Sequence, residues 1–175
     1  MFTQEDNELI QREFESLRIA SLKRCANQEE YEDVIRAFEF ANEAHKGVRR
    51  RSGEPYILHP IAVAKIVVEE IGLGYKSIVT ALLHDIAKPK VKRTDEKGID
   101  HFYGHDRKSA QMAEEILKEL RFDHHTKNRI VTWILYHDIF REYSMSVLRK
   151  KKKKIGAENM EGMFQVCRAD IMAQS

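Results

Sequence analysis

The sequence of 175 residues predicts an all-α fold, and three observations support this class. Apolar residues recur at intervals of three and four along most of the chain, which is the period of a helix with one buried face. The chain contains 3 prolines and 8 glycines, a content typical of helical proteins rather than of turn-rich β folds. Because domains contain roughly 150 residues, the length fits one domain. We therefore expect a single domain over residues 1–175.

Two amphipathic helices are expected in the first quarter of the chain. One apolar repeat predicts a helix over about residues 5–25, which would precede the core of the domain at 31–175, and a second repeat predicts a helix ending near His45. The segment 46–58 then interrupts the periodicity with two glycines, one proline and three consecutive arginines. We expect a basic loop there, and such loops often carry functional residues.

The next two helices should form the centre of the domain. Pro60 suits the first turn of a helix that continues until Gly72. The segment 77–87 is apolar nearly all round, which predicts a helix buried on every side. His84 and Asp85 are expected to lie inside this buried helix.

The second half of the chain alternates polar segments with further helices. Residues 88–106 form a long polar excursion with a short hairpin expected around Gly98, and such a length is typical of an active-site rim. Apolar repeats then predict helices over about residues 110–120, 130–135 and 160–171.

The charge balance argues against a general nucleic-acid binder. Lys and Arg number 30 against 28 Asp and Glu, which gives a net charge of +2 with neutral histidines. One run of six basic residues extends from Arg149 to Lys154. We interpret this run as a solvated helix face, and nucleic-acid binding through it is the alternative.

The cysteines and the apolar segments indicate a compartment. Cys25 and Cys167 are far apart in sequence and form no CxxC pair, so neither a disulfide framework nor a thiolate zinc site is expected. No apolar run approaches the ~18 residues that a membrane span requires, and the acidic N-terminus lacks the apolar core of a signal peptide. We expect a cytoplasmic protein that does not cross a membrane.

Histidines and aspartates provide the strongest chemical signal in the chain. Asp85 lies in the most apolar segment, where a carboxylate is costly unless it is paired or bound to a cation. One interpretation is that the carboxylate forms an ion pair with a nearby His or Arg. The other is that it binds a metal. His59, His84, Asp85 and Asp170 together offer two imidazoles and two carboxylates, a set suited to Mn, Fe, Co, Ni or Zn.

Two sets of motifs stand out along the chain. The front half contains Ala44-His45, Arg50 to Tyr56, His59-Pro60 and Ala81 to Asp85. These motifs resemble the hydrolase domain of RelA/SpoT enzymes, which act on guanosine tetraphosphate. The back half contains Asp85 to Pro89, Phe102 to Asp106, Ser109-Ala110, Arg168 to Asp170 and Ala173-Gln174. These resemble the HD domain of CCA-adding tRNA nucleotidyltransferases, and both families belong to the HD superfamily of metal-dependent phosphohydrolases.

The resemblance implies an all-α bundle and a ligand set. By resemblance, the ligands of one divalent metal are His59, His84, Asp85 and Asp170. In some HD proteins two further histidines bind a second metal or the substrate phosphate. His105 and His137 occupy the corresponding positions here. A purely structural role of these two histidines is the third alternative.

One departure concerns the residues after the His-Asp pair. RelA/SpoT hydrolases carry a Glu-Asp pair that handles the attacking water, whereas Lys88 and Pro89 occupy those positions here. Hydrolysis of guanosine tetraphosphate is therefore disfavoured, and Lys88 is expected to contact a phosphate instead. Arg50 and Arg51 are expected to bind the substrate, since a guanidinium can clamp a phosphate or stack on a base, unless they are merely solvated.

The expected function is hydrolysis of a phosphate ester, of a nucleotide or a related small molecule, by metal-activated water. Asp85, Lys88 and His105 are the expected catalytic residues. Two alternatives remain at this point. The chain could be a nucleotide-binding or sensing module without turnover, or an accessory in RNA processing.

Overall fold

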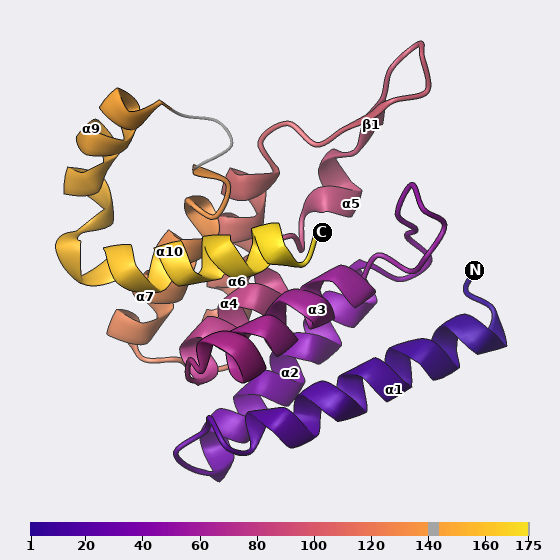
Figure 1. Cartoon of the computed structure of the whole chain (residues 1–175), viewed down its shortest axis with the longest axis horizontal. Coiled ribbons are helices and arrows are strands. Elements are labelled where there is room, and N and C mark those ends of the chain that lie inside the picture. Colours follow the sequence, from indigo (N-terminus) through magenta and orange to yellow (C-terminus); the bar gives the residue numbers. More distant parts are fainter. Residues whose placement is uncertain (140–143, 175) are drawn as a thin grey trace.

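The computed structural model describes residues 1–139 and 144–174, and it confirms the all-α class (Figure 1). Residues 140–143 and 175 of the expected domain lie outside this description. The elements are α1 (Gln4–Ser21), α2 (Gln28–Ala44), α3 (Leu58–Ile66), the π-helical turn η1 (Val67–Ile71), α4 (Tyr75–Leu83), α5 (Lys88–Val91), β1 (Arg93–Thr94), β2 (Asp100–His101), α6 (His105–Glu119), α7 (His124–Leu135), α9 (Met145–Ile155) and α10 (Ala157–Met172). No helix in the described part of the chain combines the length and the apolar character that a bilayer span requires.

Helix α4 is the centre of the molecule, as its apolar sequence predicts. Every residue from Ser77 to Leu83 is buried, and helices α2, α3, α7 and α10 all pack against it. Helices α1 and α6 add apolar side chains to the same core. A smaller apolar cluster joins α7 to α9 and α10, with Trp133 and Met163 among its buried members.

The expected extent of the central helix is wrong at its C-terminal end. Helix α4 ends at Leu83, so His84 is its C-cap and Asp85 lies in the turn that follows. The backbone there forms i to i−3 hydrogen bonds, from Ile86 to Leu83 and from Lys88 to Asp85. Pro89 lies in the first turn of the next helix, α5, where its missing N–H is tolerated.

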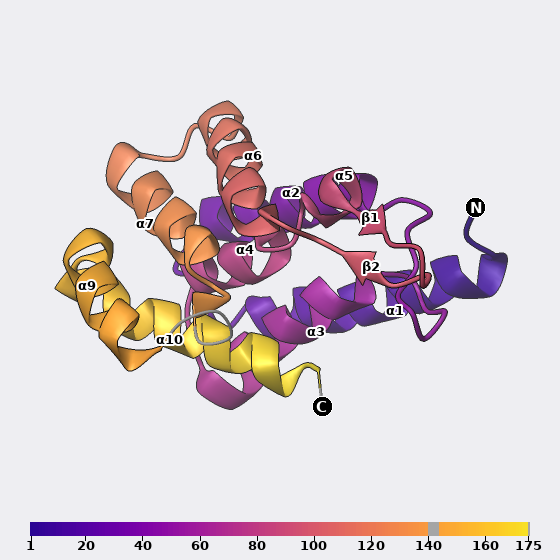
Figure 2. The same ribbon diagram turned by 90° about the horizontal axis from the view of Figure 1, so that it is seen from above.

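The polar excursion contains more structure than its sequence indicates. The hairpin around Gly98 is confirmed, with β1 paired antiparallel to β2. The short helix α5 precedes it, and α6 begins at His105 itself. In both ribbon views the hairpin and the basic loop before α3 project from the same end of the bundle (Figures 1 and 2). Asp6 of α1 forms an ion pair with Arg49 and so ties that loop to the N-terminal helix.

His45, the C-cap of α2, is a fully buried residue next to the basic loop. Its ring stacks on Tyr56, with ring centroids 4.9 Å apart. Neither ring nitrogen has a hydrogen-bond partner among the described residues. Burial disfavours the charged imidazolium and lowers the pKa of His45 to about 4.

This pKa predicts an acid-sensitive contribution to stability. Between about pH 6.5 and pH 4 the unfolded chain binds a proton at His45 that the folded chain does not bind, so stability falls as the pH falls through this window. His45→Phe keeps the stacking and removes the proton. The free energy of unfolding of His45→Phe minus that of the wild type should therefore be about 2 kcal/mol larger at pH 5 than at pH 7.5.

Thermal unfolding at the two pH values measures this gain. His124→Phe is the matched control, because His124 is exposed at the start of α7. Parallel pH profiles of the wild type and His45→Phe would show that His45 titrates normally in the folded protein.

Gly162 gives the smaller cluster its close packing. A Cβ at this position would lie inside the van der Waals radius of the Trp133 indole, which also donates a hydrogen bond to the carbonyl of Asn159 at 2.9 Å. Gly162→Ala should therefore lower the free energy of unfolding by about 1–3 kcal/mol, although Gly→Ala in an open helix interior stabilises by about 1 kcal/mol. Denaturant unfolding followed by the fluorescence of Trp133, the single tryptophan of the chain, measures the change. Glu161→Ala is the exposed control, and a stabilised Gly162→Ala protein would contradict this packing.

Candidate metal centre

The first group of donor atoms combines residues from three helices. His59 lies in the first turn of α3, His84 caps α4, and Asp170 lies in α10. His59 Nε2 is 3.0 Å from Asp170 Oδ1, and His84 Nε2 is 3.6 Å from the same oxygen. All three side chains are buried, and their donor atoms lie within 4.8 Å of one another.

A second group of donor atoms lies on the other side of Asp85. His105 begins α6, and His137 and Asp138 follow the end of α7. His105 Nε2 lies 3.2 Å from His137 Nε2 and 3.0 Å from Asp138 Oδ2. Asp138 was not among the residues expected at the site. Its signal was a second His-Asp dipeptide directly after an apolar helix, which repeats the context of His84 and Asp85.

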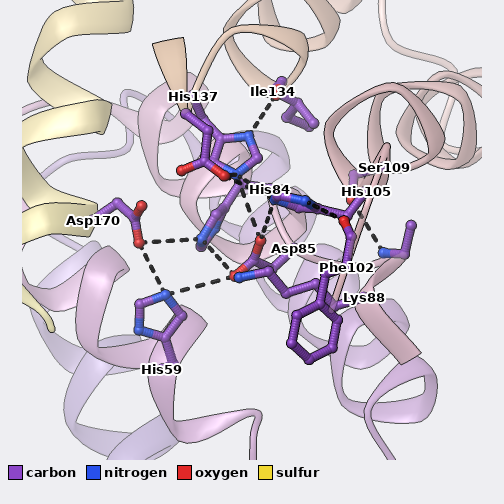
Figure 3. Close-up of polar contacts among 12 residues, drawn as sticks. His59, His84, Asp85, Lys88, Phe102, His105, Ser109, Ile134, His137 and Asp170 are labelled. Atoms are coloured by element: carbon purple, nitrogen blue, oxygen red, sulfur yellow. Dashed lines mark hydrogen bonds and ion pairs between the residues drawn. The ribbon is translucent and has the colours of Figure 1, made fainter. Parts of the chain in front are cut away.

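Asp85 lies between the two groups and contacts both (Figure 3). Its Oδ2 is 3.2 Å from His84 Nε2 and 3.7 Å from His59 Nε2. Its Oδ1 is 3.5 Å from Nε2 of both His105 and His137. A carboxylate that uses one oxygen for each group has the arrangement of a bridging ligand.

Backbone carbonyls orient three of the histidines in the same way. Nδ1 of His84, His105 and His137 hydrogen-bonds to the carbonyl three residues earlier, at 2.6, 3.0 and 2.6 Å. Since Nδ1 must donate the proton to a carbonyl, Nε2 of a neutral ring carries the lone pair. All three lone pairs then face Asp85 and are available to a metal.

Charges in the buried site compensate one another. Burial by itself lowers the pKa of His84, but Asp85 and Asp170 outweigh burial and raise this pKa to about 10. Burial would raise the pKa of Asp85, yet His84, Lys88 and His137 together hold it well below its usual value. A proton and a metal therefore compete for Nε2 of His84, and metal binding there would be coupled to proton release.

Two observations on the described residues indicate that they fit a metal. His84 Nε2 and Asp85 Oδ1 are buried and make no hydrogen bond of good geometry. The donor set consists of imidazole nitrogens and carboxylate oxygens, which suits a divalent transition metal. Leaving such atoms unsatisfied would be costly, and a cation between them removes that cost.

Lys88 and Tyr56 contact Asp85 from the side of the solvent. Lys88 Nζ and the Tyr56 hydroxyl each lie 2.8 Å from Asp85 Oδ2, and Lys88 donates a hydrogen bond of 2.9 Å to the tyrosine. Tyr56 was not expected at the site. Its place in the basic loop, three residues before His59, was the available signal.

A cavity of about 320 Å³ leads from the solvent to this centre. Arg50, Arg51, Tyr56, His59 and Lys88 line it together with hairpin residues. Arg50 is paired with Glu54 at 3.0 Å, and no ion pair involves Arg51 within residues 1–139 and 144–174. The structure therefore places both arginines at the wall of the cavity that His59 also lines.

Known proteins resemble this chain in its sequence. A guanosine-3′,5′-bis(diphosphate) 3′-pyrophosphohydrolase of Aquifex aeolicus is 48% identical over 54 residues, which cover 31% of this chain and 8% of the relative. The bifunctional (p)ppGpp synthase/hydrolase SpoT of Escherichia coli is 41% identical over 73 residues, which cover 42% of this chain and 10% of the relative. The matched segments thus span at most a tenth of these two longer proteins.

The sequence pattern of the HD domain matches residues 56–158. This segment contains His59, His84, Asp85, His105 and His137, and it ends before Asp170. The match covers more than half of the chain, and the helical fold agrees with it. The chain belongs to the HD domain family.

Proposed function

We propose that this protein is a metal-dependent phosphohydrolase that acts on a nucleotide or a related small phosphate ester. The observation that carries the proposal is Asp85, a buried carboxylate shared by two groups of His and carboxylate donors. It lies directly behind Tyr56 and Lys88, which line a cavity with cationic side chains. The kinship with hydrolases of the HD domain family supports the same reaction class.

The ligands of the first metal would be His59, His84, Asp85 and Asp170. His105 and His137 would hold a second metal or the substrate phosphate, and the neighbouring Asp138 favours the metal because it adds a third donor. Mn, Fe, Co, Ni and Zn all suit this donor set. A divalent ion bound there would lower the pKa of a water and neutralise charge on the phosphate.

Three cationic side chains would act on the substrate directly. Lys88 Nζ lies at the cavity floor beside Asp85, where it can donate to a phosphate oxygen. Arg50 and Arg51 line the wall above it and can hold a second part of the substrate. Asp85 would act on the attacking water either as a ligand of the metal or as the base that accepts its proton. His105 would donate to the phosphate if it binds no second metal.

The basic run on α9 does not contribute to this cavity. Lys151 is half-buried and the other five residues of the run are exposed. None of the six lines the cavity. The RNA-processing alternative therefore gains no support from the site. The sensing alternative keeps the same pocket and differs only in the absence of turnover.

The ligand assignment predicts the metal content of variants. Asp85→Ala should reduce the bound metal to near zero, because it removes the carboxylate that both donor groups share. Elemental analysis of purified protein measures this content. Asp85→Asn, which keeps the volume, tests the same point if the alanine variant unfolds, and His101→Ala on the hairpin is the control. Full metal content in both Asp85 variants would contradict the assignment.

The residues after the His-Asp pair predict the substrate preference. Since Lys88 and Pro89 replace an acidic pair, guanosine tetraphosphate should be hydrolysed with a kcat/KM at least about tenfold below that of the best ordinary nucleotide. Phosphate release from nucleoside mono-, di- and triphosphates and from guanosine tetraphosphate by the metal-loaded protein measures this ratio, with Asp85→Asn as the inactive control. Tight binding of unaltered nucleotides with no release would favour the sensing module, and equal rates would refute the stated preference.

A further inference from the structure

The cavity above the metal centre has two chemically different walls. The loop before α3 contributes Val48 and the three arginines 49–51. The hairpin side contributes the apolar Ile99 and Phe102 together with Lys92 and Asp100, whose charges pair with each other at 2.8 Å. Pro89 of α5 extends the apolar wall. A small molecule in this cavity would therefore meet several arginines from the loop, and from the hairpin side apolar surface next to a mutually neutralised ion pair.

Phe102 connects the hairpin to the site in two ways. Its carbonyl accepts the hydrogen bond from His105 Nδ1 at 3.0 Å, so its backbone is fixed relative to the donor groups. Its half-buried ring lines the cavity, with the ring centroid 5.6 Å from Lys88 Nζ (Figure 3). The ring is thus held next to the place where a phosphate would meet Lys88.

Ile99 places a second apolar surface at the mouth of the cavity. Its side chain is 43% exposed, although it follows Gly98 at the tip of a polar hairpin. Both Asp95 Oδ1 and the β1–β2 pairing hold the tip in place, since Asp95 accepts the Ile99 N–H at 2.9 Å. Tyr103, which directly follows Phe102, is 77% exposed and does not line the cavity.

We propose that the hairpin is the nucleobase-binding wall of the substrate site, with Phe102 stacking on the base and Ile99 covering its edge. This inference rests on the proposed function, because a phosphate at the metal centre leaves the rest of the substrate between the hairpin and the arginine loop. A base has a flat apolar face, which an aromatic ring binds by stacking whatever the base is. A sugar phosphate without a base offers this wall a smaller and more polar surface and would cover less of its apolar area.

Nucleosides test the base site without any phosphate chemistry. Adenosine, guanosine, cytidine and uridine are titrated into 15N-labelled protein, and the amide signals of Gly98, Ile99 and Phe102 are followed. At least one nucleoside should shift these signals and give a measurable Kd. Phe102→Ala should weaken this binding at least about tenfold, which corresponds to about 1.4 kcal/mol, and Phe102→Tyr should restore it.

Tyr103→Ala is the matched control, since it removes a neighbouring aromatic ring outside the cavity. It should change the Kd by less than about twofold. Metal content is measured for every variant, so that a displaced His105 would be recognised. The absence of nucleoside-induced shifts, or equal effects of Phe102→Ala and Tyr103→Ala, would overturn the base site.

A kinetic comparison separates this inference from the proposed function. On metal-loaded protein, Phe102→Ala should raise the KM for nucleoside monophosphates at least about tenfold and leave ribose 5-phosphate unaffected. Phosphate release with no response to Phe102→Ala would refute the base site and leave the phosphohydrolase intact. Nucleoside binding at the hairpin in a protein that releases no phosphate from any substrate would support the base site and refute the hydrolase.

Discussion

The burial of the Asp85 carboxylate is the constraint on which the rest of this structure depends. The side chain is 1% exposed, and a lone carboxylate in such surroundings would cost several kcal/mol. Lys88, His84 and Tyr56 surround one oxygen, and His105 and His137 face the other. Helix α3, the start of α6 and the turn after α7 therefore converge on the turn that follows α4.

The early end of α4 is what makes this convergence useful. A helix that continued through Asp85 would direct its carbonyls into the intrahelical hydrogen-bond ladder. Because the helix stops at Leu83, the carbonyl of Ala81 accepts a hydrogen bond from the ring of His84. The same hydrogen bond, from Nδ1 to the carbonyl three residues earlier, recurs at His105 and His137. Local backbone geometry thus fixes three imidazoles with Nε2 toward one carboxylate, before any metal is present.

The two segments without long helices determine what reaches this centre. The arginine loop and the hairpin both leave the bundle at the same end (Figure 2). Side chains of both segments line one cavity. The loop is held by the ion pair between Arg49 and Asp6, and the hairpin by Lys92 and Asp100 at 2.8 Å. Such tied loops combine a variable surface with a rigid position relative to the metal centre, which suits selection among small phosphate esters.

The sequence by itself determined the helical class, the buried central segment, the hairpin and the residues His59, His84, Asp85 and Asp170 as a candidate set. Apolar periodicity reports burial of each segment, and a carboxylate in an apolar segment indicates an unusual environment wherever it occurs. Only the tertiary structure decided that Asp138 and Tyr56 join the site, that α4 ends before the His-Asp pair, and that Arg50 and Arg51 line the same cavity as the hairpin. These facts depend on distances between segments far apart along the chain, and a pattern of neighbours in sequence carries no information on which carboxylate oxygen faces which ring.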